Sequence, residues 1–150
     1  MLTWLKILCA VDLSSGSRCA VDDAAELARR FDAALTLVHV RQPPSSTSLW
    51  SELPPERLET DAQELRHALD GWRAEAERIA GRPVRVVLTR GSPAAEIVRL
   101  AAAEKPDLVV TGTHGRRGLG RLVLGSVAER VAREAPCPVL VARAPPAARA

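Results

Sequence analysis

The chain has 150 residues, of which 47% are hydrophobic and 26% are charged, and its formal net charge is +3. This size and balance predict one globular domain with its own core and leave no room for a second domain. The arginines are scattered, so the charge does not indicate nucleic-acid binding. The short N-terminal apolar run soon meets Asp12, which fits neither a signal peptide nor a membrane span, and we expect a cytoplasmic protein.

Apolar residues follow two alternating patterns along the chain. Continuous apolar or β-branched runs of strand length indicate buried strands, and apolar residues at steps of three and four indicate amphipathic helices. Ser92 and Pro93 predict an N-cap and a first helical residue, and Gly81 predicts a helix end. The expected elements are strands 5–11, 34–40, 84–89, 108–111 and 139–143 and helices 18–31, 58–79, 93–103 and 126–135.

Five strands alternating with four helices predict right-handed crossovers and an open parallel sheet covered by helices on both faces. We therefore expect a Rossmann-like α/β domain over 1–143, followed by a flexible tail at 144–150. Ligands of such sheets bind beyond the carboxyl ends of the strands, where the strand order reverses. Asp12 and Gly112 follow the first and fourth predicted strands, so both lie where a ligand is expected.

The connection 41–55 is long for a link between a strand and a helix, and it is rich in proline and serine. Disorder is our preferred interpretation of this composition. Cover for a binding site and a surface for a partner are the alternatives, so its role stays open.

The run GTHGRRGLGRLVLGS, from Gly112 to Ser126, has the properties of a phosphate-binding loop. Glycines such as Gly112 and Gly115 allow positive φ angles and let backbone amides approach anionic oxygens. Gly125 and Ser126 begin a helix, where the dipole and free N–H groups, including that of Val127, favour phosphate. The Ser126 hydroxyl is a further donor.

Arg116 and several basic neighbours add positive charge around this loop. The loop is not a Walker A motif, because no lysine precedes Ser126. It does not match the Rossmann fingerprint either, because Val123 stands where the third glycine belongs. Neither of these common nucleotide-binding motifs therefore describes the site.

This loop, together with VAERVAREAPCPVLVAR after it, resembles the ATP-binding branch of the universal stress proteins. The resemblance covers nearly the whole chain, with AVDLS, LVHV, RGSPAAEIV and PDLVVTG in the family's order. It implies a homodimer, often formed through the last strand. Leu13 departs from the family pattern, in which many members have Gly or Phe after the aspartate.

Carried over position by position, the resemblance implies a set of residues that bind ATP. Asp12 would lie near the ribose and Val40 against the adenine, and both roles fit the chemistry of these side chains. The residues implied at or near the phosphates are Gly112, Gly115, Arg116, Gly125, Ser126 and Val127. Whether Mg²⁺ bridges Asp12 and the phosphates is left open.

The resulting hypothesis is an ATP-binding, nucleotide-responsive sensor in a stress response, acting through an unknown regulatory protein. No Walker-type acid and no base lie beside the loop in the sequence, so we expect no catalytic residues and at most slow ATP hydrolysis. Two alternatives are a ligase or flavin-linked enzyme, which would need a further substrate site, and an interaction module that binds no nucleotide.

The cysteines and one histidine have simpler interpretations. Cys9, Cys19 and Cys137 lie in apolar segments without metal-binding spacing, so we interpret them as reduced core residues, with a catalytic thiol as the alternative. His39 lies inside an apolar strand and is interpreted as a core histidine with satisfied hydrogen bonds rather than as a base.

Overall fold

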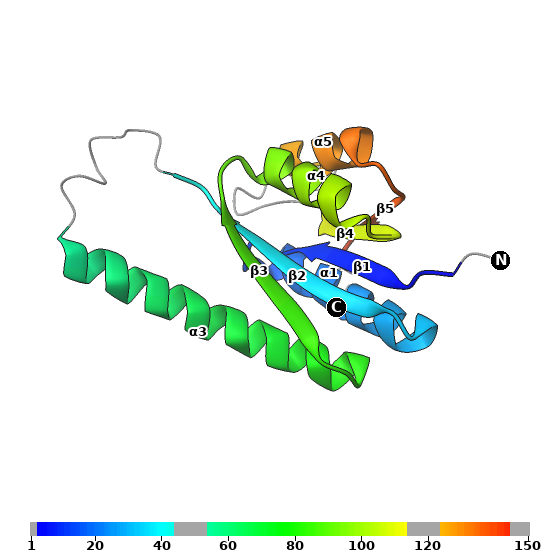
Figure 1. Cartoon of the computed structure of the whole chain (residues 1–150), viewed down its shortest axis with the longest axis horizontal. Coiled ribbons are helices and arrows are strands. Elements are labelled where there is room, and N and C mark those ends of the chain that lie inside the picture. Colours follow the sequence, from blue (N-terminus) through cyan, green and yellow to red (C-terminus); the bar gives the residue numbers. More distant parts are fainter. Residues whose placement is uncertain (1–2, 44–53, 114–123, 145–150) are drawn as a thin grey trace, which may run out of the picture.

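The computed structural model describes residues 3–43, 54–113 and 124–144 of the chain (Figure 1). Within these ranges strands and helices alternate as predicted. The elements are β1 (Lys6–Ala10), α1 (Ser15–Phe31), β2 (Ala34–Arg41), α3 (Pro55–Ala80), β3 (Val84–Arg90), α4 (Pro93–Glu104), β4 (Leu108–Gly112), α5 (Ser126–Glu134) and β5 (Val139–Ala142). Most of the connection 41–55 and all of the predicted tail except Ala144 lie outside the described residues.

Two helices begin earlier than predicted, because local capping sets their first turns. α1 begins at Ser15 rather than Arg18, since Ser14 is its N-cap residue and the Ser14 hydroxyl accepts a hydrogen bond from the Ser17 amide at 3.3 Å. α3 also begins early, at Pro55, since proline suits the first helical position.

The other predicted helix ends are mostly confirmed. Gly81 ends α3 in the left-handed region, with a φ of 68°, and its amide donates to the Glu77 carbonyl at 2.8 Å. Ser92 occupies the N-cap position of α4, but its side chain makes no capping hydrogen bond, so its predicted role is confirmed in position only.

The five strands form one parallel sheet in the order β3-β2-β1-β4-β5, which confirms the predicted fold class. β1 is central and pairs with β2 on one side and β4 on the other. The chain builds the sheet outward through β2 and β3 and then returns past β1 to β4. The strand order therefore reverses between β1 and β4, and this is the point where such sheets bind ligands.

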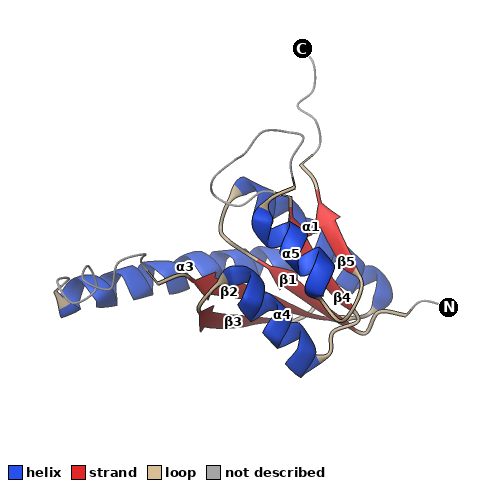
Figure 2. Cartoon of the chain, turned by 90° about the horizontal axis from the view of Figure 1, so that it is seen from above, coloured by secondary structure: helices blue, strands red, loops and turns tan. Residues whose placement is uncertain are grey.

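The helices form two layers, one on each face of the sheet (Figure 2). α1 and α3 cover the face on which Ile7, Leu37 and Val110 are buried. α4 and α5 cover the opposite face, where Leu8, Val38 and Val109 are buried. The face of α1 against the sheet is built from fully buried alanines, which let the helix approach the strands closely: Ala20, Ala24, Ala25 and Ala28.

The long helix α3 packs on the domain only through its C-terminal half. Leu69 and Ala76 are buried, and the Trp72 ring lies 4.0 Å from the guanidinium carbon of Arg18 on α1. The N-terminal half extends past the sheet, and its apolar residues are partly buried at most (Figures 1 and 2). Neither α3 nor another helix within the described ranges combines the length and apolar character needed to cross a membrane.

The three cysteines differ in their burial. All are free thiols. Cys9 is fully buried, as predicted, and burial raises the pKa of its thiol far above the usual range. Cys19 and Cys137 are only partly buried, so the prediction that they are core residues is only partly correct. Cys19 lies in α1 and Cys137 in the connection between α5 and β5, whereas Cys9 lies in the central strand.

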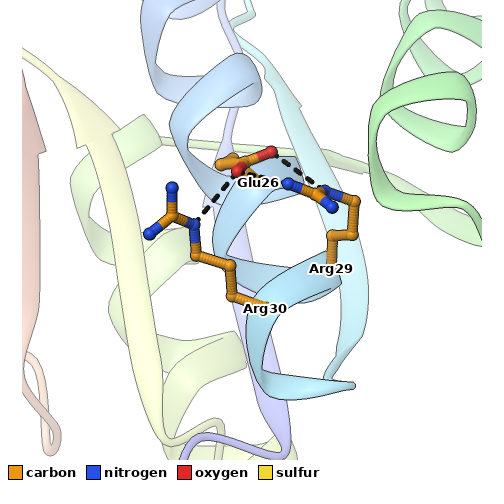
Figure 3. Close-up of polar contacts among 3 residues, drawn as sticks. All are labelled: Glu26, Arg29 and Arg30. Atoms are coloured by element: carbon orange, nitrogen blue, oxygen red, sulfur yellow. Dashed lines mark hydrogen bonds and ion pairs between the residues drawn. The ribbon is translucent and has the colours of Figure 1, made fainter.

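Glu26 on α1 accepts hydrogen bonds from two arginines of the same helix (Figure 3). The two bonds from Arg29, and then the one from Arg30, lower the pKa of Glu26 from 4.5 to about 2. A carboxyl whose pKa is lower in the folded state stabilises the fold above its unfolded pKa, and the contribution is lost as pH falls toward 2. We expect Glu26→Gln to melt below the wild type near neutral pH and the difference to shrink as pH falls from about 5 to about 2. A difference in melting temperature that does not change with pH would contradict this assignment.

Candidate functional site

Three residues predicted to bind ligand lie at the carboxyl edge of the sheet. Asp12 follows β1, Val40 is near the end of β2, and Gly112 is the last residue of β4. The strands are parallel and adjacent, in the order β2-β1-β4, so these positions are neighbours along one edge. The structure therefore brings Asp12, Val40 and Gly112 together where the strand order reverses.

The Asp12 carboxylate is held at the start of α1. Its Oδ1 atom accepts hydrogen bonds from the Ser14 amide at 2.9 Å, from the Ser14 hydroxyl and from the Ser17 hydroxyl. The Asp12 amide lies 2.8 Å from the Ser17 Oγ atom. These bonds fix the direction of the carboxylate before any ligand arrives.

The roles of Ser14 and Ser17 at the start of α1 were not predicted from the sequence. The signal was available as D-x-S-x-x-S. An aspartate can form an Asx turn with the residue two positions on, and a serine at an N-cap accepts a hydrogen bond from the backbone amide three positions on. The two patterns overlap at Ser14.

Leu13 has a φ of 65°, in the left-handed region that disfavours a side chain with a Cβ atom. Its side chain nevertheless packs against the core cluster on the α1 face of the sheet. This conformation gives a physical reason why glycine suits the position after the aspartate. In this chain the apolar packing of Leu13 offsets the cost of its backbone conformation.

Gly112 lies against the first turn of α1. A Cβ atom at Gly112 would be 2.9 Å from the Gly16 carbonyl oxygen and 3.0 Å from its carbonyl carbon. The expectation of a positive φ is wrong for Gly112, because within the described ranges the glycines with positive φ are Gly81 and Gly91. The glycine is needed here because two backbone segments approach each other closely.

α5 begins beside the end of β4. The Gly125 amide donates to the Thr113 carbonyl at 2.7 Å, which joins the chain on the two sides of residues 114–123. Gly125 is the N-cap residue, and its carbonyl accepts the first helical bond, from Glu129, at 2.9 Å. The amides of Ser126 and Val127 come before this first bond, so they have no hydrogen-bond partner within the helix. Ser126 is exposed, and the Val127 side chain packs on the core.

Two of the predicted site residues, Gly115 and Arg116, lie outside the described residues. Their proposed contacts with phosphate therefore stay predictions. Within the described ranges no three His, Cys, Asp or Glu side chains gather into a group that could hold a metal ion.

His39 is buried, and its Nδ1 atom lies 2.8 Å from the Val11 carbonyl oxygen. This confirms the interpretation of His39 as a core histidine with a hydrogen-bond partner. The contact joins β2 to the end of β1 just before Asp12, so it supports the edge on which the site lies.

Comparisons with known proteins agree with the fold. The model of the universal stress protein family matches residues 3–143. A universal stress protein of Methanocaldococcus jannaschii is 39% identical over 145 residues, which is 93% of this chain and 82% of that protein. Universal stress protein UspA from Lactobacillus plantarum has a TM-score of 0.84 and 26% identity, covering 95% of this chain and 100% of the other. An Arabidopsis thaliana family protein solved with AMP bound has a TM-score of 0.69 and 22% identity, covering 95% and 93%, and shows a likeness of fold alone.

Proposed function

Because this chain belongs to the universal stress protein family, we propose that it binds ATP along the carboxyl edge of its sheet and acts as a nucleotide-responsive regulator in a stress response. The observation that carries the proposal is the order of groups along this edge. Amide donors lie at the start of α5, beside the end of β4, a carboxylate follows β1 and an apolar residue lies near the end of β2. This is the order of phosphate, ribose and base in a nucleotide.

The phosphate end is the start of α5. Free amides at a helix N-terminus and the helix dipole favour an anion, and the Ser126 hydroxyl adds a donor. Gly112, Gly125 and Val127 line the same end, and Gly115 and Arg116 belong to the proposed loop. Hydrogen bonds to a charged group contribute about 1.5–3 kcal/mol each. Four or five of them would together contribute about 6–15 kcal/mol, which is comparable with the association cost of about 4–15 kcal/mol.

Asp12 and Val40 provide the other two contacts. The oriented Asp12 carboxylate suits the paired hydroxyls of a ribose, which donate hydrogen bonds to it. Val40 is partly buried against the α4 layer and offers an apolar surface to adenine. ATP is the nucleotide we propose, and Mg²⁺ would enter with its phosphates, with Asp12 as a candidate ligand.

A binding role is preferred over catalysis. The proposal assigns no residue to activating a water molecule, so ATP hydrolysis is expected to be slow at most. An interaction module that binds no nucleotide is the second candidate, and the site at the strand-order reversal favours the first. We place the binding domain over 1–143 and the protein in the cytoplasm.

We further propose that the chain forms a homodimer through β5. This strand is at the edge of the sheet, and Val139, Leu140 and Val141 are each only partly buried in the single chain. An apolar edge strand is a ready surface for pairing with a second copy. A change in the loop on ATP binding would then alter the contacts within the dimer or with an unidentified regulatory protein.

The direct test of the proposal is to denature the purified protein and to identify any released nucleotide by chromatography. The emptied and refolded protein is then titrated with ATP by calorimetry. Released adenine nucleotide, or micromolar binding in the titration, supports the proposal. If neither assay detects nucleotide binding, the interaction module is the better description.

The substitution Ser126→Asp is expected to weaken ATP binding without destabilising the fold. A carboxylate in the first turn of a helix stabilises it by about 0.3–1 kcal/mol, so the fold should be at least as stable as the wild type. The same carboxylate would repel phosphate, so we expect the affinity for ATP to fall at least tenfold, or about 1.4 kcal/mol. Urea denaturation and calorimetry measure the two effects.

Two control variants accompany this change. Ser126→Thr keeps the hydroxyl and should retain ATP binding. Ala132→Asp makes the same change in net charge on an exposed position near the other end of α5, and should change ATP affinity by about twofold at most, because salt screens distant charges. Equal losses for both aspartate variants would place the phosphates elsewhere.

A further inference from the structure

A hydrogen-bonded cluster joins the end of β3 to the first turn of α4. The Thr89 hydroxyl donates to Oε2 of Glu96 at 2.7 Å. The Arg99 guanidinium binds both oxygens of the same carboxylate, at 3.0 Å to Oε1 and 2.8 Å to Oε2. The Glu96 side chain is only 18% exposed, so this cluster is a partly buried part of the sheet edge.

The turn between β3 and α4 leaves room for the Glu96 side chain. Gly91 has a φ of 138°, and a Cβ atom there would lie 3.0 Å from the Glu96 Cγ atom. The Gly91 amide donates to the Arg41 carbonyl at 3.1 Å, which ties the turn to the end of β2. The glycine therefore leaves space for Glu96 to reach Thr89.

The charge state of Glu96 decides the direction of the Thr89 hydroxyl. Hydrogen bonds from Arg99, and then from Thr89, lower the pKa of Glu96 to about 2. At neutral pH the carboxylate is ionised and can only accept hydrogen bonds. The Thr89 hydrogen must therefore point at Glu96, and the Thr89 oxygen offers only lone pairs to any other group.

Thr89 lies beside the proposed position of the base. Thr89 and Val40 are register partners in the pairing of β2 with β3. Val40 and Val87 both pack on the α4 face of the sheet, and Thr89 follows Val87 by one strand repeat, so it lies on that face too. β3 is also the next strand beyond β2 on the side away from the phosphate end.

From this arrangement we propose that Thr89 selects the base of the nucleotide, by accepting a hydrogen bond from an exocyclic amino group and rejecting a carbonyl at the same place. Glu96 and Arg99 are positioning residues that fix the hydroxyl. The inference rests on the proposed function, since it takes Val40 as the base contact. It predicts a preference for adenine over hypoxanthine, which differ here by an amino group and a carbonyl.

The test is calorimetric titration of the wild type and three variants with ATP and with ITP. The wild type should bind ATP at least tenfold more tightly than ITP, since an acceptor that faces a carbonyl is left unpaired. Thr89→Val keeps the shape of the side chain and should bring this ratio to about threefold or less, mainly by weakening ATP. Thr89→Ser keeps the hydroxyl and should keep the preference.

Glu96→Gln tests the positioning role. A glutamine amide can donate to Thr89 as well as accept from it, so the hydroxyl is released to donate to a carbonyl. The ratio of ATP to ITP affinity should fall because ITP binds more tightly, which a purely structural role would not produce. Melting temperatures check that each variant is folded.

The outcomes separate the two proposals. If the wild type binds neither nucleotide, the proposed function fails and this inference fails with it. If the wild type binds ATP but Thr89→Val keeps the wild-type ratio, or loses both nucleotides equally, the site stands and the role of Thr89 is overturned.

Discussion

Replacing Gly112 by alanine is expected to destabilise the protein by about 1–3 kcal/mol and to weaken ATP binding at least tenfold. The new Cβ atom would lie 2.9 Å from the Gly16 carbonyl oxygen, which is backbone and cannot rotate away. The first turn of α1 must therefore shift. The same turn carries Ser17, which orients Asp12, so a change in β4 reaches the residue proposed to contact the ribose. Urea denaturation measures the first effect and calorimetry the second.

Gly71→Ala is the matched control for this prediction. Gly71 is in the interior of α3, is exposed, and has no atom within 4 Å of the position of a Cβ atom. Alanine has the higher helix propensity, so this variant should be more stable by about 0.5–1 kcal/mol and should bind ATP as the wild type does. If Gly112→Ala destabilises the protein and Gly71→Ala stabilises it, the contact of Gly112 with α1 is the cause of the loss. A stable Gly112→Ala variant with full affinity would contradict the close approach.

Leu37→Ala should have the largest effect on folding, a loss of about 2–5 kcal/mol. Leu37 is fully buried in the core under α1 and α3. Its strand is paired on both sides, with Cys9 of β1 and Val86 of β3 as its register partners. The surrounding strands cannot collapse around the lost side chain, so a cavity is left.

The control for this substitution is Leu88→Ala in the neighbouring strand. Leu88 is 44% exposed, so its removal returns less apolar surface to water and should cost below about 1.5 kcal/mol. Urea denaturation measures both losses in the free energy of unfolding, from the shift in midpoint between curves of equal slope. A smaller loss for Leu37 than for Leu88 would show that the packing of the sheet is not as described.

Patterns that depend on chain periodicity could be predicted from the sequence, and close contacts between distant segments could not. Strands and helices followed from apolar spacing, and Gly81 was identified because a helix end needs a residue that tolerates the left-handed region. The approach of Gly112 to Gly16 is a contact between β4 and α1. No local pattern encodes that distance.

The candidate site shows the same division. Asp12, Val40 and Gly112 could be placed at one edge, because the carboxyl ends of parallel strands meet there. The hydrogen bond between Thr89 and Glu96 could not be predicted, because it depends on the 138° φ of Gly91 in the turn between them. The partial burial of Cys19 and Cys137 likewise depends on how elements pack rather than on their apolar neighbours.

The overhang of α3 affects how the assembly of this protein must be measured. A helix of 26 residues is about 39 Å long. A compact domain of this size has a radius of gyration of about 15 Å, so the helix is comparable with its full width. A body with such a projection has more frictional drag than a sphere of equal mass, and its elution in gel filtration would overstate that mass. A monomer could then be mistaken for a dimer, so light scattering or sedimentation equilibrium, which do not depend on shape, should decide whether β5 pairs two chains.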